Sequence, residues 1–158
     1  MAKLLLFGYG NPGRGDDALG PELVEHIAKR LPVNVECQND MQLQVEHVTD
    51  LAACDRVLFV DADMSCTEPF VFCEIAAAKD DSYSSHAMNP TALLYAYRQV
   101  YGADAPPAFL LRIRGYDFEL GDPLSAQASA NLEAATELVR KLCIEPDVRG
   151  WREMMADA

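Results

Sequence analysis

Three residues of this sequence carry side chains of the kinds that bind divalent cations or move protons. Asp17 lies in a glycine-rich loop after one apolar segment, Asp61 directly follows another, and His86 lies in a polar loop before a predicted helix. Two carboxylates and one imidazole are suitable ligands for nickel or zinc, with positions left open for water or substrate. Each also has an ordinary alternative role, as a helix cap, an acceptor for loop amides and a surface side chain, respectively.

The hydrophobic pattern predicts the elements that position these residues. The predicted strands are 4–7, 33–37, 57–60, 70–75 and 109–113, and the predicted helices are 19–31, 43–51, 90–101 and 132–142. Asn89 is the expected cap of the third helix, and Asp16 or Asp17 that of the first. Alternation of strands and helices predicts a three-layer α/β domain, with a five-stranded, mainly parallel twisted sheet and helices on both faces. Ligands of such sheets bind at the carboxyl ends of the strands, where Asp17 and Asp61 fall.

The length of 158 residues fits one domain. We assign it to residues 1–145. After Glu145 the apolar period is lost, so we expect residues 146–158 to form a loosely ordered tail.

The formal net charge of −12 argues against nucleic acid and membrane surfaces as partners, since both attract clustered Lys and Arg. The apolar segment 4–7 is too short for a signal peptide, which predicts a cytoplasmic protein. Five scattered cysteines without a CxxC pair are expected to be reduced thiols. His26 and His47 fall in helical patterns beside glutamates and are expected on solvated helix faces, without a functional role.

The glycine loop has two alternative interpretations. GYGNPG at 8–13 matches the GxGxxG pattern of a dinucleotide site, with Asp40 at a suitable distance for a ribose contact, but Asp16 and Asp17 would repel a pyrophosphate there. GNPG at 10–13 also resembles the start of peptidyl-tRNA hydrolases, although the Arg-His-Asn stretch expected next is replaced by Arg14, Gly15 and Asp16.

Three motifs together resemble the hydrogenase maturation protease family, in order and spacing, over about residues 3–143. They are GYGNPGRGDDALG at 8–20, which is similar to the family's GxGNxxxxDDxxG opening, VDAD at 60–63 and SHAMNP at 85–90. The resemblance implies that Asp17, Asp61 and His86 are the metal-contacting and catalytic residues. It also implies a five-stranded sheet between helices.

The activity implied by the resemblance is an endopeptidase that removes the C-terminal extension of a [NiFe]-hydrogenase large-subunit precursor. Nickel would come with the substrate, and no organic cofactor is expected. We expect a monomer, and we assign substrate recognition to Gly10, Asn11, Asp16 and Asp40. The amides of the loop 8–15 are candidates for binding a developing oxyanion. A non-catalytic nickel chaperone using the same three metal-contacting residues is the remaining alternative.

One stretch departs from the common family pattern. Residues 39–42 read Asn-Asp-Met-Gln where many members have an Asp-Gly-Gly-Thr-like loop, which leaves the role of this loop open. MQLQVEH at 41–47 and RIRGYDFELG at 112–121 resemble the subgroup that serves cytoplasmic NAD-linked bidirectional hydrogenases.

Overall fold

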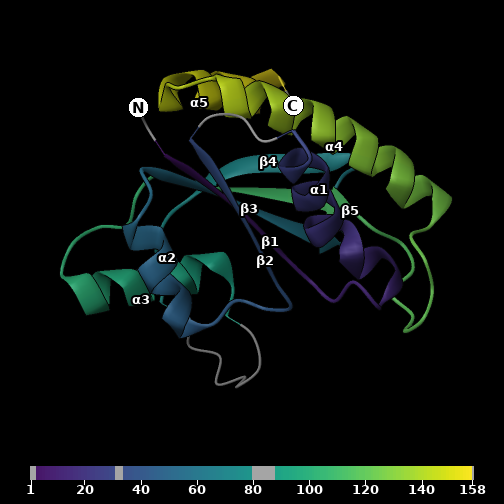
Figure 1. The fold of residues 1–158 in the computed structure, drawn as a ribbon, viewed down its shortest axis with the longest axis horizontal. Coiled ribbons are helices and arrows are strands. Elements are labelled where there is room, and N and C mark those ends of the chain that lie inside the picture. The colour runs from purple at the N-terminus through teal and green to yellow at the C-terminus, as the bar shows by residue number, and fades with distance from the viewer. Residues whose placement is uncertain (1–2, 31–33, 80–87, 158) are drawn as a thin grey trace.

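The computed structural model describes residues 3–30, 34–79 and 88–157 (Figure 1). The elements, in chain order, are β1 (Leu4–Tyr9), η1 (Gly15–Ala18), α1 (Leu19–Ala28), β2 (Val35–Asp40), η2 (Val45–His47), α2 (Val48–Ala52), β3 (Arg56–Asp63), β4 (Phe70–Ile75), α3 (Pro90–Tyr101), β5 (Ala108–Arg114), α4 (Ala126–Ile144) and α5 (Val148–Asp157).

The five strands form one sheet in the order β2-β1-β3-β5-β4. The first three pairs are parallel, and β4 runs antiparallel to β5 at the edge. The predicted mainly parallel sheet is therefore confirmed. Its strand order brings the ends of β1 and β3 together at the centre of the sheet, where the strand order reverses direction.

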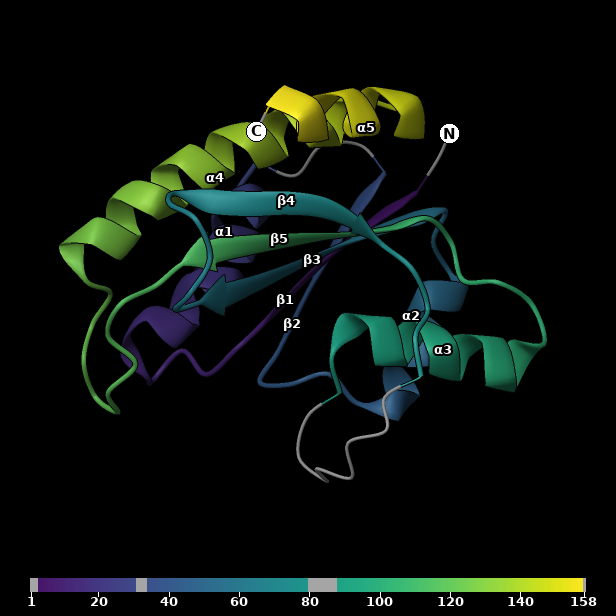
Figure 2. The ribbon, with the colours of Figure 1, turned by 180° about the vertical axis from the view of Figure 1, so that it is seen from behind.

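Helices cover both faces of the sheet, as predicted. In Figures 1 and 2, α1, α4 and α5 lie on one face, and α2 and α3 lie on the other. The strands divide their apolar side chains accordingly, because successive residues point to opposite faces. Leu6 and Leu58 pack into the core under α1 and α4, whereas Phe7 and Phe59 pack into the core under α2 and α3.

Helix α1 lies very close to the central strands. A Cβ atom at Gly20 would lie 2.5 Å from the Val60 carbonyl oxygen and 2.9 Å from that of Tyr9. Glycine at this position lets the first turn of α1 contact the backbones of β3 and β1 near the carboxyl ends of both strands.

The helix α3 begins and ends where it was predicted. The Asn89 side chain accepts a hydrogen bond from the Ala92 N–H at 2.8 Å, and Gly102 ends the helix in a left-handed conformation with φ of 68°.

The first helix differs from its prediction. Residues 15–18 form a 3-10 turn, Ala18 occupies the N-cap position of α1, and neither Asp16 nor Asp17 caps the helix with its side chain.

The loosely ordered tail expected after residue 145 is wrong, since these residues form α5. Trp151 is fully buried, 4.9 Å from the Phe109 ring centroid, and its indole N–H donates to the Leu142 carbonyl oxygen at 3.0 Å. The Arg56 guanidinium lies 4.6 Å from the centroid of the indole ring. Helix α5 is therefore part of the domain and covers the amino end of β3.

Within the described part of the chain, no helix is long and apolar enough to cross a membrane.

Candidate functional site

Asp17 and Asp61 lie near the carboxyl ends of β1 and β3, close enough for the charge of Asp17 to act on Asp61. Asp61 is in β3 and accepts a hydrogen bond from the Ala62 N–H at 2.8 Å. Asp17 lies in η1, where its carboxylate accepts the Asn11 N–H at 2.7 Å. Gly10 has φ of 146° and lies so close to Asp17 that a Cβ atom would be 2.2 Å from the Asp17 carbonyl oxygen. The turn therefore holds Asp17 against the end of β1, beside Asp61.

The surroundings of Asp61 raise its pKa to about 7. Burial is the main cause, since it penalises the charged form, and the charges of Asp17 and Asp63 act in the same direction. The Ala62 N–H and the Tyr9 hydroxyl oppose this rise. Both protonation states of Asp61 are therefore accessible near neutral pH.

Tyr9 is a member of this site that the sequence analysis did not identify. It is the last residue of β1, and burial followed by the charge of Asp61 raises the pKa of its hydroxyl above the ordinary value. The hydroxyl therefore stays protonated beside Asp61. Its position two residues before Asn11, inside the glycine motif, was the available signal.

The amides of the glycine loop are already used within the protein. The N–H groups of Gly10, Asn11 and Gly13 donate to the Asp40 carbonyl, the Asp17 carboxylate and the Asn11 side chain. Those of residues 14–17 donate to the carbonyl oxygens of Asn11, Asp122, Asp117 and Arg14, in that order. The oxyanion-binding role considered for these amides is therefore not supported, because a ligand would have to displace internal hydrogen bonds.

The same bonding argues against a dinucleotide site. A pyrophosphate binds to free amides at a helix N-terminus. Here the amides are occupied, and the carboxylates of Asp16 and Asp17 lie in the turn before α1.

Asp16 is a structural residue, which corrects its assignment to substrate recognition. It is fully buried, and its carboxylate accepts hydrogen bonds from the N–H groups of Tyr116, Asp117 and Ser125 and from the Ser125 hydroxyl, at 2.7 to 3.0 Å. Burial raises the pKa of Asp16, but these bonds outweigh it and hold the pKa below its ordinary value. Asp16 therefore joins the glycine loop to the loop 115–125.

The other residues assigned to recognition lie at the same edge of the sheet. Asn11 is partly exposed, and Gly10 is buried. Asp40 ends β2, is exposed, and accepts the His47 Nε2–H at 3.1 Å. His47 is buried, with Nδ1 accepting the Gln44 N–H at 2.8 Å and its ring against Phe7. The solvated position expected for His47 is wrong, because the 3-10 turn η2 directs this face of residues 45–47 into the core.

His86, the third predicted metal contact, lies outside the described residues. Met88, two positions later, forms a bridge with Leu43, which follows β2 by three residues. Across residues 3–30, 34–79 and 88–157, no three His, Cys, Asp or Glu side chains are grouped closely enough to hold a metal ion. The described part of the site thus contributes two carboxylates.

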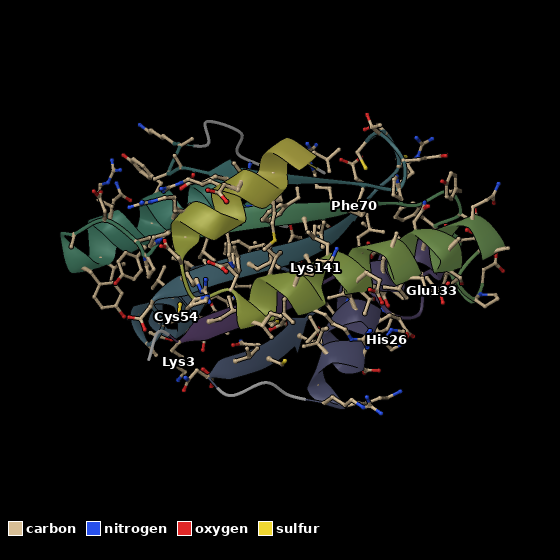
Figure 3. All side chains as sticks on the ribbon, turned by 90° about the horizontal axis from the view of Figure 1, so that it is seen from above. Lys3, His26, Cys54, Phe70, Glu133 and Lys141 are labelled. Atoms are coloured by element: carbon tan, nitrogen blue, oxygen red, sulfur yellow. The ribbon has the colours of Figure 1, made fainter. Side chains whose placement is uncertain are left out.

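Hollows elsewhere on the surface do not include these carboxylates. Two adjoining hollows, of about 370 and 460 Å³, lie between α1 and α4 and share His26, Glu137 and Arg140. Figure 3 shows this region, with His26, Glu133 and Lys141 labelled. A third, of about 220 Å³, lies near the beginning of β5. These three hollows, all lined by described residues, are therefore separate from the carboxylate pair.

Comparison with known proteins identifies similar folds. No family model matches the sequence, and the search of curated proteins found no significant match. Among solved structures, the [NiFe]-hydrogenase maturation protease HycI from Thermococcus kodakarensis KOD1 has a TM-score of 0.72 and 22% identity, over 91% of this chain and 94% of that one.

Two further structures extend the likeness. The hydrogenase maturating endopeptidase HybD from E. coli has a TM-score of 0.70 and 24% identity, over 87% of this chain and 89% of that one. A hydrogenase 2 maturation peptidase from a Thaumarchaeota archaeon has a TM-score of 0.65 and 20% identity, over 89% and 97%. Across almost its whole length, therefore, this chain has the fold of hydrogenase maturation endopeptidases.

Proposed function

We propose that this chain is an endopeptidase that removes the C-terminal extension of a [NiFe]-hydrogenase large-subunit precursor after nickel has been inserted. The observation that carries the proposal is the meeting of Asp17 and Asp61 at the carboxyl ends of β1 and β3. Both belong to motifs that resemble those of the maturation proteases. The similar solved structures named as such proteases support the same activity.

The proposal includes recognition of nickel that the substrate brings. Two neighbouring carboxylates repel each other, and a divalent cation between them would relieve that repulsion. Asp17 and Asp61 supply two oxygen ligands, and we assign the third contact to His86. The remaining ligands belong to the precursor, so the endopeptidase binds nickel well only when the precursor presents it.

Hydrolysis needs a group that takes a proton from the attacking water. We assign this role to Asp61, whose pKa of about 7 in the metal-free protein lets its carboxylate exchange a proton near neutral pH, whereas a carboxylate of ordinary pKa is a weak base there. The Tyr9 hydroxyl orients the Asp61 carboxylate. Asp17, held by the Asn11 N–H, positions the substrate at the carboxyl edge.

We also propose that the protein acts as a monomer in the cytoplasm. All five cysteines are free thiols, as expected in a reducing compartment.

The test is mass spectrometry of a full-length large-subunit precursor incubated with this protein. The precursor of a NAD-linked bidirectional hydrogenase is the first choice, prepared with and without nickel. We expect a single cut, near the C-terminus and only in the nickel-loaded sample. An intact loaded precursor would refute the protease, and tight binding of free nickel without cleavage would favour a chaperone.

Variants link the cleavage to the site. We expect Asp17→Asn and Asp61→Asn each to slow cleavage at least about a hundredfold, the usual effect of losing an acid–base or positioning group. Asp104→Asn is the matched control, because this carboxylate is exposed and pairs with exposed Arg98. Cleavage by both site variants at the wild-type rate would refute the assignment of the site.

A further inference from the structure

Four large apolar side chains are exposed around the carboxyl edge of the sheet. They are Met41, Val45, Met64 and Leu120, each more than half exposed. Met41 and Val45 follow β2, Met64 follows β3, and Leu120 follows β5. We call these four residues the apolar rim. Among the residues that the structure describes, the other exposed large apolar side chains are Val100, Tyr101 and Ile144, at the C-terminal ends of α3 and α4.

The apolar rim is continuous with the candidate site. Met41 follows Asp40, whose carbonyl oxygen accepts the Gly10 N–H at 3.1 Å. Leu120 precedes Gly121, whose N–H donates to the Gly13 carbonyl oxygen at 2.8 Å. Figure 2 shows the β3–β4 and β5–α4 loops on the same side of the sheet as the β1–α1 loop. The loops that carry Met41 and Leu120 are therefore bonded directly to the glycine loop that precedes Asp17.

The loops that carry the rim are held in place. The Ser65 N–H and hydroxyl both donate to the Asp63 carboxylate at 2.8 Å, which fixes the turn containing Met64. The Met41 N–H donates to its neighbour Asp40 at 2.8 Å. Val45 begins η2, which His47 anchors in the core. Preformed apolar contacts lose little conformational entropy on binding, so they favour association.

Each member of the rim has an acidic neighbour in the sequence. The pairs are Asp40–Met41, Val45–Glu46, Asp63–Met64 and Glu119–Leu120. Asp63 is ion-paired with Arg112 at 3.2 Å, so the surplus negative charge of this surface comes from the other three carboxylates, on a chain with a net charge of −12. A complementary partner surface is apolar and bordered by Lys and Arg.

We propose that the apolar rim is a docking surface for the folded body of the precursor, through an apolar patch bordered by basic side chains. The inference rests on the proposed function and deepens it. Recognition then has two parts. The rim binds the body of the precursor whether or not nickel is present. Asp17 and Asp61 contact the nickel and take part in cleavage of the C-terminal extension.

The test measures binding separately from cleavage. Nickel-free precursor, which is not cut under the proposed function, is immobilised, and the affinity of the chain is measured by surface plasmon resonance at several salt concentrations. We expect Met64→Gln combined with Leu120→Gln to raise Kd about tenfold, a loss of about 1.4 kcal/mol. Wild-type binding should weaken as salt increases.

Val100→Gln combined with Ile144→Gln is the matched control. It removes apolar side chains of similar exposure from the C-terminal ends of α3 and α4, outside the apolar rim. We expect its Kd to stay within about twofold of wild type. With nickel-loaded precursor, the rim variant should raise KM and leave kcat within about twofold. Thermal unfolding checks that both variants fold.

The outcomes separate this inference from the proposed function. Cleavage by wild type with no effect of the rim variant on Kd or KM would overturn the docking surface and leave the protease standing. Rim-dependent binding without cleavage of any loaded precursor would support the docking surface and refute the protease. Absence of both binding and cleavage would refute both.

Discussion

Asp16 accepts two hydrogen bonds from Ser125, one from the backbone N–H at 2.7 Å and one from the hydroxyl at 2.8 Å. The same hydroxyl accepts the Ala128 N–H at 3.2 Å as the N-cap of α4. One serine therefore begins α4 and fixes the turn that holds Asp17. Of two adjacent acids in the motif, the first organises the backbone, and the second is the one that we assign to the substrate.

Replacement of Asp16 by Asn should destabilise the protein. The amide nitrogen would face donors that now meet a carboxylate oxygen, and the loss should be about 3 kcal/mol, typical of hydrogen bonds to a buried charge. Urea denaturation measures it, with Asp104→Asn as the exposed control. Equal midpoints for the two variants would contradict the structural role of Asp16.

The stabilisation by Asp16 should also depend on pH. Its pKa in the folded protein lies below the ordinary value of 3.8, so the contribution is fully present above about pH 4 and is lost as pH falls through the lower, folded value. The difference in unfolding free energy between wild type and Asp16→Asn should therefore shrink below pH 4. Measurement on the free protein, without substrate or nickel, tests this, and a constant difference down to pH 2 would count against it.

Substitution of Gly20 should displace the ends of β1 and β3 that carry the site. An added Cβ would meet the carbonyl oxygens of Val60 and Tyr9, which directly precede Asp61 and Gly10. We expect Gly20→Ala to destabilise the protein by about 1 to 3 kcal/mol, as overpacking does, and to slow cleavage.

The control for this change is Gly13→Ala in the same motif. A Cβ there would meet only the Asn11 side chain, at 3.3 Å. Thermal unfolding and precursor cleavage should distinguish the two alanine variants. A Gly20→Ala protein with wild-type stability and activity would show that α1 can move away from the strands without cost.

Helix α5 should contribute strongly to stability. We expect Trp151→Ala to cost about 3 to 5 kcal/mol, because it leaves a cavity beside Phe109 and removes the ring under Arg56. Arg149→Ala, at an exposed position of the same helix, should change the stability by less than about 0.5 kcal/mol. A truncated chain ending at residue 145 that melted like the full chain would refute this role.

The central fold could be predicted because its signals are local. The buried strands are continuous apolar segments, and α3 carries an Asn cap and a terminal glycine. The placement of Asp17 and Asp61 at one edge followed from the rule for parallel sheets. Their proximity required only that β1 and β3 be neighbours, which the sheet confirms.

The remaining errors concern contacts between distant segments. Asp16 and Asp17 are chemically identical in the sequence, and only the loop 115–125 distinguishes the buried one from the other. The end of the chain shows only a weak amphipathic pattern, because its apolar residues are few. Val148, Trp151 and Met155 nevertheless recur at helical spacing, and the core that they join is formed by α1, α4 and the strands, including Phe72 of β4 and Phe109 of β5.

The bond between Asp16 and Ser125 spans 109 positions of the sequence. Contacts of such separation form late, because the entropy of closing a long loop opposes them until the intervening strands have paired. During synthesis, the turn containing Asp17 lacks its anchor until α4 has begun to emerge. The glycine motif comes first in the chain, yet we expect its final geometry to be completed late in folding.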